Sequence, residues 1–324
     1  MPTTNPVRLE SATLAVAAWP DRGFAITEIT DIPSGANALW QRGGFEPAAF
    51  TRHLGPAGAA SSDTFLDLFV GGWFEMFPTA GFSGSFPGPA GSAESFVHGE
   101  VMRLPWSILE QGPTVLVAKV RTLRTPFDLM RRLEITPDGT LAVTEVLHNN
   151  SSISAPYIWG HHPCFDRKTF AGGQIQAEAS SAVVPAPVLD HAHNGLVPGA
   201  RFDWPRAPTL DGGVQAVATV PEEPDGRNEQ VSLTLRTGVV RLTAPRIQRA
   251  FRLVFDIRDF PYLLVWQDYQ APDVSFWGTC DTVALEPWSA PGRSPNEVVA
   301  TSDIRLLGPD ASLTVRLEAA WEAL

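Results

Sequence analysis

The stretch TVLVAKVRTLRTPFDLMRRLEITPDGTLAVTEVL, residues 114–147, contains three strand patterns in succession. Apolar and polar residues alternate at Thr114 to Leu123, Leu129 to Thr136 and Thr140 to Leu147, which is the period of a half-buried strand. Pro137-Asp138-Gly139 separates the last two patterns and is typical of a tight turn. The stretch therefore predicts consecutive antiparallel strands.

The same alternation recurs along the whole chain. Eight further segments show it: Thr13 to Ala18, Phe24 to Ile29, Val231 to Arg236, Val239 to Thr243, Phe251 to Ile257, Tyr262 to Trp266, Thr282 to Leu285 and Ser312 to Leu317. Helical periodicity is confined to two short segments, Asp63 to Val70 and Leu317 to Leu324. The 27 Gly and 29 Pro residues also disfavour helices. We predict an all-β fold, a large antiparallel β-sandwich that spans residues 1–324 as a single domain.

Charge and composition narrow the class of partner. The net charge of −11 disfavours nucleic acid or an anionic membrane as a partner, because either would need a basic face. No apolar run is long enough to span a membrane, and the start MPTTNPVRLE lacks the pattern of a signal peptide. We therefore expect a cytoplasmic protein that binds a small molecule, and the sequence leaves its oligomeric state open.

Cysteine and aromatic residues add two expectations. Cys164 and Cys280 are the only cysteines, too few for a disulfide framework and without a CxxC pair, so we expect buried thiols. The ten Trp and eighteen Phe residues, against three Tyr, are compatible with stacking on the C–H face of a sugar, although most aromatic residues fill cores.

Four local motifs contain the candidate functional residues: GGWFEMFP at 71–78, VHGE at 97–100, WGHHPCF at 159–165 and LEPW at 285–288. Adjacent side chains on a strand point to opposite faces, so we expect only one of His161 and His162 to face a site. Pro163 places the pair at a strand end, where sandwich proteins often form pockets. The alternative is that both histidines only form hydrogen bonds within the core.

Glu286 follows the apolar run Thr282 to Leu285, so we expect its carboxyl group to be buried. Burial would raise its pKa and make it a better base near neutral pH, unless an arginine pairs with it. Asp268 is a weaker case of the same kind. His98, before Gly99, is a candidate for a loop that closes over a ligand, and the Gly-, Ser- and Pro-rich segment Gly81 to Ser95 is expected to be a long loop at the mouth of the site.

In the order of these motifs the sequence resembles the aldose 1-epimerase (mutarotase) family. The tracts at 71–75 and 159–163 look closer to a divergent bacterial branch of that superfamily than to galactose mutarotase. The resemblance covers nearly the whole chain and implies the family's large β-sandwich, the supersandwich. It identifies His162, followed by Phe165, with the general acid and Glu286 with the late catalytic glutamate. It also identifies His98-Gly99 with the substrate-binding His-Gly. Pro163-Cys164 departs from the Ser-Tyr that is common in the family.

The resemblance implies further substrate contacts. Asp190 and Asp268 are both candidates for the binding carboxylate, and Asp268 is preferred because it ends a strand pattern close to Glu286. Asp268, with Gln267 beside it, and Arg132 or Arg131 would hold sugar hydroxyls. Trp73 or Trp266 would stack on the ring.

The activity implied by the resemblance is interconversion of the α and β anomers of a free or phosphorylated aldose. Glu286 would take the proton of the anomeric hydroxyl while His162 protonates the ring oxygen, with no metal or other cofactor. Activity would then rise with ionisation of Glu286 and fall with deprotonation of His162.

Three alternatives come from other classes of protein. A metalloenzyme would use His161 and His162 with Glu286 or Asp268 as ligands. A glycoside hydrolase or lyase on a similar sandwich would pair Asp268 with Glu286. A non-catalytic carbohydrate-binding protein would keep the pocket without turnover.

Overall fold

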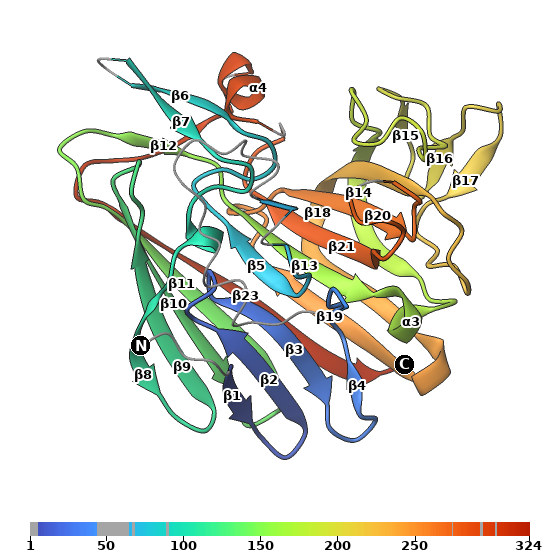
Figure 1. The fold of residues 1–324 in the computed structure, drawn as a ribbon, viewed down its shortest axis with the longest axis horizontal. Coiled ribbons are helices and arrows are strands. Elements are labelled where there is room, and N and C mark those ends of the chain that lie inside the picture. Colours follow the sequence, from blue (N-terminus) through green and yellow to red (C-terminus); the bar gives the residue numbers. More distant parts are fainter. Residues whose placement is uncertain are drawn as a thin grey trace.

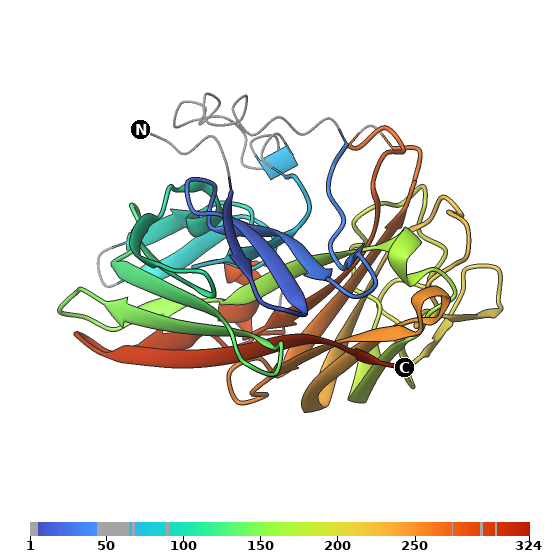
Figure 2. The same cartoon turned by 90° about the horizontal axis from the view of Figure 1, so that it is seen from below.

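The computed structural model describes residues 6–43, 65–66, 69–88, 91–273, 275–291, 294–301 and 303–324. Seventeen strands form one antiparallel sheet, which folds back on itself into two packed layers (Figures 1 and 2). The predicted all-β fold, a large antiparallel β-sandwich, is confirmed.

The first layer contains the strands predicted from residues 114–147. Its strands, in pairing order, are β8 (Ser107–Gln111), β9 (Val115–Arg121), β10 (Phe127–Ile135), β11 (Leu141–Asn149), β23 (Ser312–Ala323) and β19 (Arg249–Phe255). Strand β10 pairs along its whole length with β11. The alternation of this stretch therefore corresponds to one face that is buried and one that is exposed to solvent.

The second layer contains the strands that build the site. In pairing order these are β20 (Tyr262–Tyr269), β21 (Asp281–Trp288), β13 (Gly160–Asp166), β5 (Trp73–Met76), β3 (Ala25–Asp31), β2 (Leu14–Trp19) and β1 (Val7–Glu10). Strand β18 (Asn228–Ala244) joins the layers, because its first half pairs with β20 and its second half with β19. The two strands expected at Val231 to Thr243 are thus one strand that passes from one layer to the other.

The remaining elements complete the described chain. They are β4 (Ala36–Asn37), β6 (Gly84–Gly88), β7 (Gly91–Ser95), β12 (Ala155–Tyr157), β14 (Ile175–Val183), β15 (Arg201–Phe202), β16 (Arg206–Pro208), β17 (Val214–Ala216), β22 (Arg305–Leu307), α3 (Arg167–Phe170), α4 (Pro295–Ala300) and the 3-10 turns η1 (Val101–Arg103) and η2 (Pro245–Ile247). Among the described residues, no helix has the length and apolar character needed to cross a membrane.

Two buried clusters lie on opposite faces of the second layer. The first fills the space between the layers and includes Leu129, Val143, Leu233, Val265, Val283 and Leu285. The second lies on the outer face and includes Phe74, Met76, Cys164, Leu264, Trp266, Ala284 and Trp288. Strand β21 is consequently buried at every residue, which accounts for the continuous apolar run before Glu286.

Several predicted segments differ in the structure. Leu317 to Leu324 is not a helix, because residues up to Ala323 continue β23 and pair with β19. The expected loop at Gly81 to Ser95 contains the hairpin of β6 and β7. Of Asp63 to Val70, residues 63, 64, 67 and 68 lie outside the described residues, and Phe65 and Leu66 are helical. The expected buried free thiols, Cys164 and Cys280, are confirmed.

A charged group is buried between the layers. Arg131 donates from Nε to Oε1 of Glu145 at 2.6 Å and pairs through Nη2 with Glu75. His161 lies between the two carboxylates, with Nε2 3.4 Å from Glu145 and Nδ1 3.5 Å from Glu75. Burial opposes ionisation of Glu145, but the charges of Arg131 and His161 outweigh it and lower the pKa of that carboxyl.

Candidate active site

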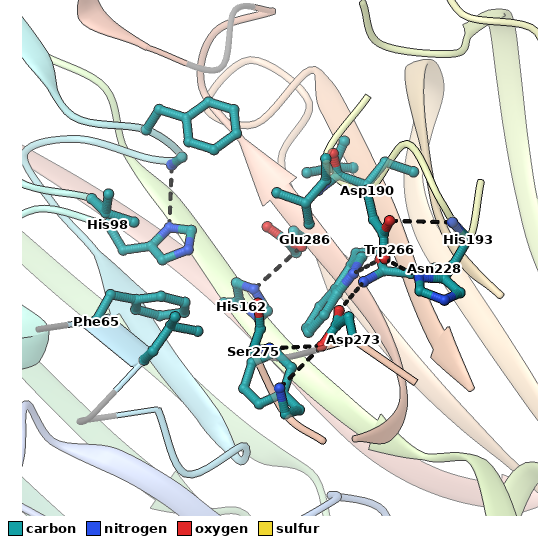
Figure 3. Close-up of a pocket in the computed structure, with 18 of the residues that line it drawn as sticks. Phe65, His98, His162, Asp190, His193, Asn228, Trp266, Asp273, Ser275 and Glu286 are labelled. Atoms are coloured by element: carbon teal, nitrogen blue, oxygen red, sulfur yellow. Dashed lines mark hydrogen bonds and ion pairs between the residues drawn. The ribbon is translucent and has the colours of Figure 1, made fainter. Parts of the chain in front are cut away.

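A cavity of about 490 Å³ lies on the outer face of the second layer. Strands β13, β18, β20 and β21 contribute residues to its wall, and so do the segment before β6 and the segment before β15 (Figures 1 and 3). The lining comprises Phe65, Leu66, Gly81, Phe82, Val97, His98, His162, Leu189, Asp190, His191, Ala192, His193, Asn228, Gln230, Leu264, Trp266, Asp273, Ser275, Phe276, Glu286 and Trp288.

Strand register brings His162 and Glu286 together. Strands β13 and β21 pair Gly160 with Trp288 and Cys164 with Ala284, and the same register places His162 opposite Glu286. Nε2 of His162 is 3.4 Å from Oε1 of Glu286 (Figure 3). His161, the preceding residue, points to the other face and joins the buried group around Arg131. The structure thus separates the two histidines, as adjacent positions on a strand require.

Aromatic rings hold the imidazole of His162 on the cavity wall. Phe74 stacks on it, with ring centroids 4.6 Å apart and an interplanar angle of 20°. Trp266 and His98 approach edge-on at 5.7 Å and 5.3 Å. Behind the ring, Sγ of Cys164 is 3.1 Å from Nδ1 of His162. The ring therefore has a defined orientation, with Nε2 toward Glu286.

Burial disfavours the charged form of both members of this pair. Desolvation lowers the pKa of His162 to about 3, and it raises the pKa of Glu286 well above its ordinary value, although Trp288 donates from Nε1 to Oε2 at 3.1 Å. Burial therefore favours a neutral imidazole beside a neutral carboxyl group. An imidazolium beside a carboxylate contains the same number of protons, so one transfer across the 3.4 Å contact interconverts the two states.

His98 reaches the cavity from a strained turn. Its φ is +56° and that of Gly99 is +76°, and a Cβ on Gly99 would lie 2.2 Å from the carbonyl oxygen of Phe77. The backbone N–H of Gly81 donates to Nδ1 of His98 at 3.2 Å. Burial first, and then the nearby His162 and Arg103, lower the pKa of His98. The neutral ring thus has its proton on Nε2 and is a hydrogen-bond donor.

Two carboxylates lie on the opposite wall (Figure 3). Asp190 Oδ2 is 2.6 Å from Nδ1 of His193, and Oδ1 accepts the backbone N–H of Ala192 at 2.8 Å. Asp273 Oδ1 accepts the backbone N–H groups of Ser275 and Phe276 at 2.9 Å and 3.1 Å. These contacts orient both groups as acceptors, which suits the hydroxyls of a polyol.

Asp268 does not line the cavity. It is fully buried behind Asn228, whose Nδ2 is 3.4 Å from Oδ2 of Asp268, and its Oδ1 accepts the backbone N–H of Ala271 at 3.1 Å. Burial, together with the charges of Asp273 and Asp190, raises its pKa to about 7. Of the two carboxylates proposed from the sequence, Asp190 is the one that reaches the cavity.

The other candidate residues are distributed over three places. Trp266 lines the cavity and donates from Nε1 to Oδ1 of Asn228 at 2.8 Å. Trp73 and Gln267 face the space between the layers, where Trp73 donates to His161 and Gln267 to the carbonyl oxygen of Val217.

Arg132 lies on the outer face of the first layer and pairs with Glu110 and Glu134. Arg132 and Arg131 are therefore both remote from the cavity wall.

Sequence reasoning missed several cavity residues. Trp288 lines the cavity and Phe74 stacks on His162. Both belong to the motifs singled out above, and strand alternation from Glu286 and from Trp73 could have indicated their faces. Asn228, Asp273 and Phe65 have no local sequence signal. The pairing of β18 with β20 places Asn228, the loop after β20 contributes Asp273, and Phe65 comes from the segment before β5.

The geometry also bears on the alternatives. His161 and His162 point to opposite faces of β13 and do not form the proposed metal ligand set. Among the described residues, the only group of three or more potential ligands close together is Glu75, Glu145 and His161, and there Arg131 is already paired with both carboxylates. Asp268 does not face Glu286 across the cavity, as a glycosidase pair would.

Searches of solved structures find the same fold in several proteins. Slr1438 from Synechocystis sp. PCC 6803 is 16% identical, with 99% of this chain and 97% of that one covered and a TM-score of 0.71. A candidate aldose 1-epimerase from Escherichia coli K12 is 17% identical, with 99% of both chains covered and a TM-score of 0.69. A galactose mutarotase-like protein from Clostridium acetobutylicum is 15% identical, with 98% and 95% covered and a TM-score of 0.69.

The TM-scores and the nearly complete coverage establish a shared fold, so the chain has the β-sandwich of the mutarotase-like structures. No protein-family model matches the sequence, and no curated protein matches it significantly.

Proposed function

We propose that this chain is an isomerase of the aldose 1-epimerase type, which interconverts the α and β anomers of an aldose. The observation that carries the proposal is the contact between His162 Nε2 and Glu286 Oε1, 3.4 Å long, on the wall of a cavity large enough for a sugar. The fold shared with mutarotase-like proteins supports the same reaction, although a fold alone does not define an activity.

The reaction needs one proton donor and one proton acceptor near the anomeric carbon. One member of the pair removes the proton of the anomeric hydroxyl while the other protonates the ring oxygen. The bond between C1 and the ring oxygen breaks and a C1 aldehyde forms. After rotation about C1–C2, the reverse transfers close the ring as the other anomer.

The pair ends with as many protons as it began with. Because ring opening already proceeds in water, a positioned acid and a positioned base, each worth about 10²–10⁴-fold, are sufficient.

The walls of the cavity suggest how the sugar would be held. Asp190 and Asp273 would accept hydrogen bonds from hydroxyls, and Nε2 of His98 would donate one from the opposite side. Trp266 offers an aromatic face beside the pair. In this proposal Asp190 takes the role that the sequence assigned by preference to Asp268.

The experiment is an anomer-exchange NMR screen with a panel of free and phosphorylated aldoses. We expect wild-type protein to accelerate exchange of at least one sugar, and Glu286→Gln to lose at least about a hundredfold of that acceleration. Glu134→Gln, on the outer face of the first layer, is the control and should keep it. Binding of a sugar without accelerated exchange would contradict the proposal and favour a non-catalytic binding protein.

A further inference from the structure

Cys164 lies directly behind the imidazole of His162. The two residues are separated by one position on β13, so their side chains share a face. Sγ of Cys164 is 3.1 Å from Nδ1 of His162 and 3.8 Å from the carbonyl oxygen of His162. The thiol is fully buried and is not part of the cavity lining. It therefore contacts the imidazole on the side away from the cavity.

The thiol keeps its proton. Burial, and then the nearby Glu286, raise the pKa of Cys164 well above its ordinary value. Its S–H points to the carbonyl oxygen of His162, which leaves the lone pairs of sulfur as an acceptor for a proton on Nδ1.

The carboxyl group of Glu286 completes the arrangement from the other side. Its Oε2 accepts the N–H of Trp288 at 3.1 Å, so the carboxyl proton belongs on Oε1, the oxygen that faces Nε2 of His162 at 3.4 Å. An O–H on Oε1 requires an acceptor, and the unprotonated Nε2 provides it. Donor and acceptor thus alternate from Oε1 through the imidazole to Sγ.

We propose that Cys164 is a positioning residue that holds the neutral imidazole of His162 in the tautomer with its proton on Nδ1. The catalytic consequence rests on the proposed function. The proton on Oε1 passes to Nε2, which gives a carboxylate and an imidazolium. The Nδ1–H of that imidazolium still donates a hydrogen bond to Sγ. Nε2 then passes that proton to the ring oxygen while the carboxylate takes the proton of the anomeric hydroxyl, and no rotation of the imidazole is needed.

The test reads the tautomer directly from the ¹⁵N chemical shifts of His162 near neutral pH. In wild-type protein we expect a protonated Nδ1 and an unprotonated Nε2. Cys164→Ala should move the proton toward Nε2, whereas Cys164→Ser, whose hydroxyl oxygen also accepts a hydrogen bond, should keep it on Nδ1. Cys280→Ala removes the other buried thiol and should leave the tautomer unchanged. A wild-type imidazole with its proton on Nε2, or an unchanged tautomer in Cys164→Ala, would overturn the proposal.

The kinetic readout separates this inference from the proposed function. With a sugar that exchanges, Cys164→Ala should lower kcat at least about tenfold with KM within about twofold, and Cys164→Ser should recover most of the loss. An unchanged kcat in Cys164→Ala would overturn the catalytic consequence. If the tautomer behaves as expected but no sugar exchanges faster, the positioning role stands and the proposed function fails. Thermal unfolding of each variant confirms that the chain is folded.

Discussion

At the scale of single residues, burial decides how the proposed pair could work. Desolvation is the largest influence on both His162 and Glu286, and it favours the neutral form of each at neutral pH. Besides the Nδ1–H of the imidazole, the active state holds one titrating proton, on either Nε2 of His162 or the carboxyl group of Glu286. This differs from the order expected from the sequence, in which Glu286 ionises first and His162 loses its proton later.

The pH dependence of kcat/KM tests these charge states. Below the His162 pKa of about 3 the pair gains a second titrating proton, and above the raised pKa of Glu286 it loses the proton that the two groups share. We therefore expect kcat/KM to reach its plateau below about pH 4. It should fall only as pH rises through the elevated pKa of Glu286. A rising limb at about 4.3, the ordinary glutamate pKa, would contradict this assignment.

Substrate binding distinguishes the two candidate carboxylates. Asp190 lines the cavity and Asp268 lies behind Asn228. Asp190→Asn should therefore raise KM by about tenfold or more, because a hydrogen bond to a charged group is worth about 1.5–3 kcal/mol. Asp268→Asn should change KM by less than about threefold. The reverse order in steady-state kinetics would restore Asp268 as the binding residue.

The sequence predicts some residue positions well for a physical reason. His162, Glu286, His98 and Trp266 stand out because polar or aromatic groups interrupt apolar or strand-like runs, and all four line the cavity. Gln267 is on a strand of the cavity wall but faces the core, and Trp73, on the neighbouring β5, also faces the core. Alternation predicts that neighbouring side chains diverge, whereas the face that carries the cavity depends on how the layers pack.

At the scale of elements, the turn that presents His98 is the most constrained part of the site. The Phe77–Gly99 bridge closes it, and Gly99 has both a positive φ and no room for a Cβ. Gly99→Ala should therefore lower the thermal midpoint and raise KM, because the turn must move His98.

Gly35 provides a matched control. Its φ is +72°, and among the described residues no heavy atom lies within 4 Å of the position that a Cβ would take. Gly35→Ala should cost about 1–2 kcal/mol of folding stability, from backbone strain alone, and leave KM unchanged. Equal effects of the two substitutions on KM would show that the turn does not position His98.

Elements were predictable where the pattern is local. Strands β9, β10 and β11 have alternating sequences and short connections, so residues 114–147 predict them closely. The end of β23 has a helical pattern, but pairing with β19 along its length outweighs that preference. Strand β13, with the two histidines, was not predicted as a strand from Gly160 to Asp166, because it is buried on both faces and contains Pro163.

At the scale of the whole molecule, the two faces of the second layer have different roles. The inner face packs against the first layer and contains the charged group around Arg131, and the outer face contains the cavity. Sequence periodicity indicates a sandwich but not this division, since the other members of the charged group, Glu75, Glu145 and His161, come from β5, β11 and β13.

Stability measurements test the role of the charged group. Arg131→Met leaves Glu75 and Glu145 buried without their cation, so it should cost about 3–5 kcal/mol of unfolding free energy. Arg132→Met, one residue further along, breaks only exposed pairs with Glu110 and Glu134 and should cost at most about 1 kcal/mol. Denaturant unfolding of both variants makes the comparison, and equal losses would contradict a structural role for the group.

The central claim is that His162 and Glu286 act as one unit that shares a proton. A double-mutant cycle on kcat/KM for anomer exchange, with His162→Gln, Glu286→Gln and the combined variant, tests it most directly. Groups that act as a unit are strongly non-additive, so we predict that the combined variant is little slower than either single variant. Losses that multiply would show that the two side chains act independently and would contradict the account.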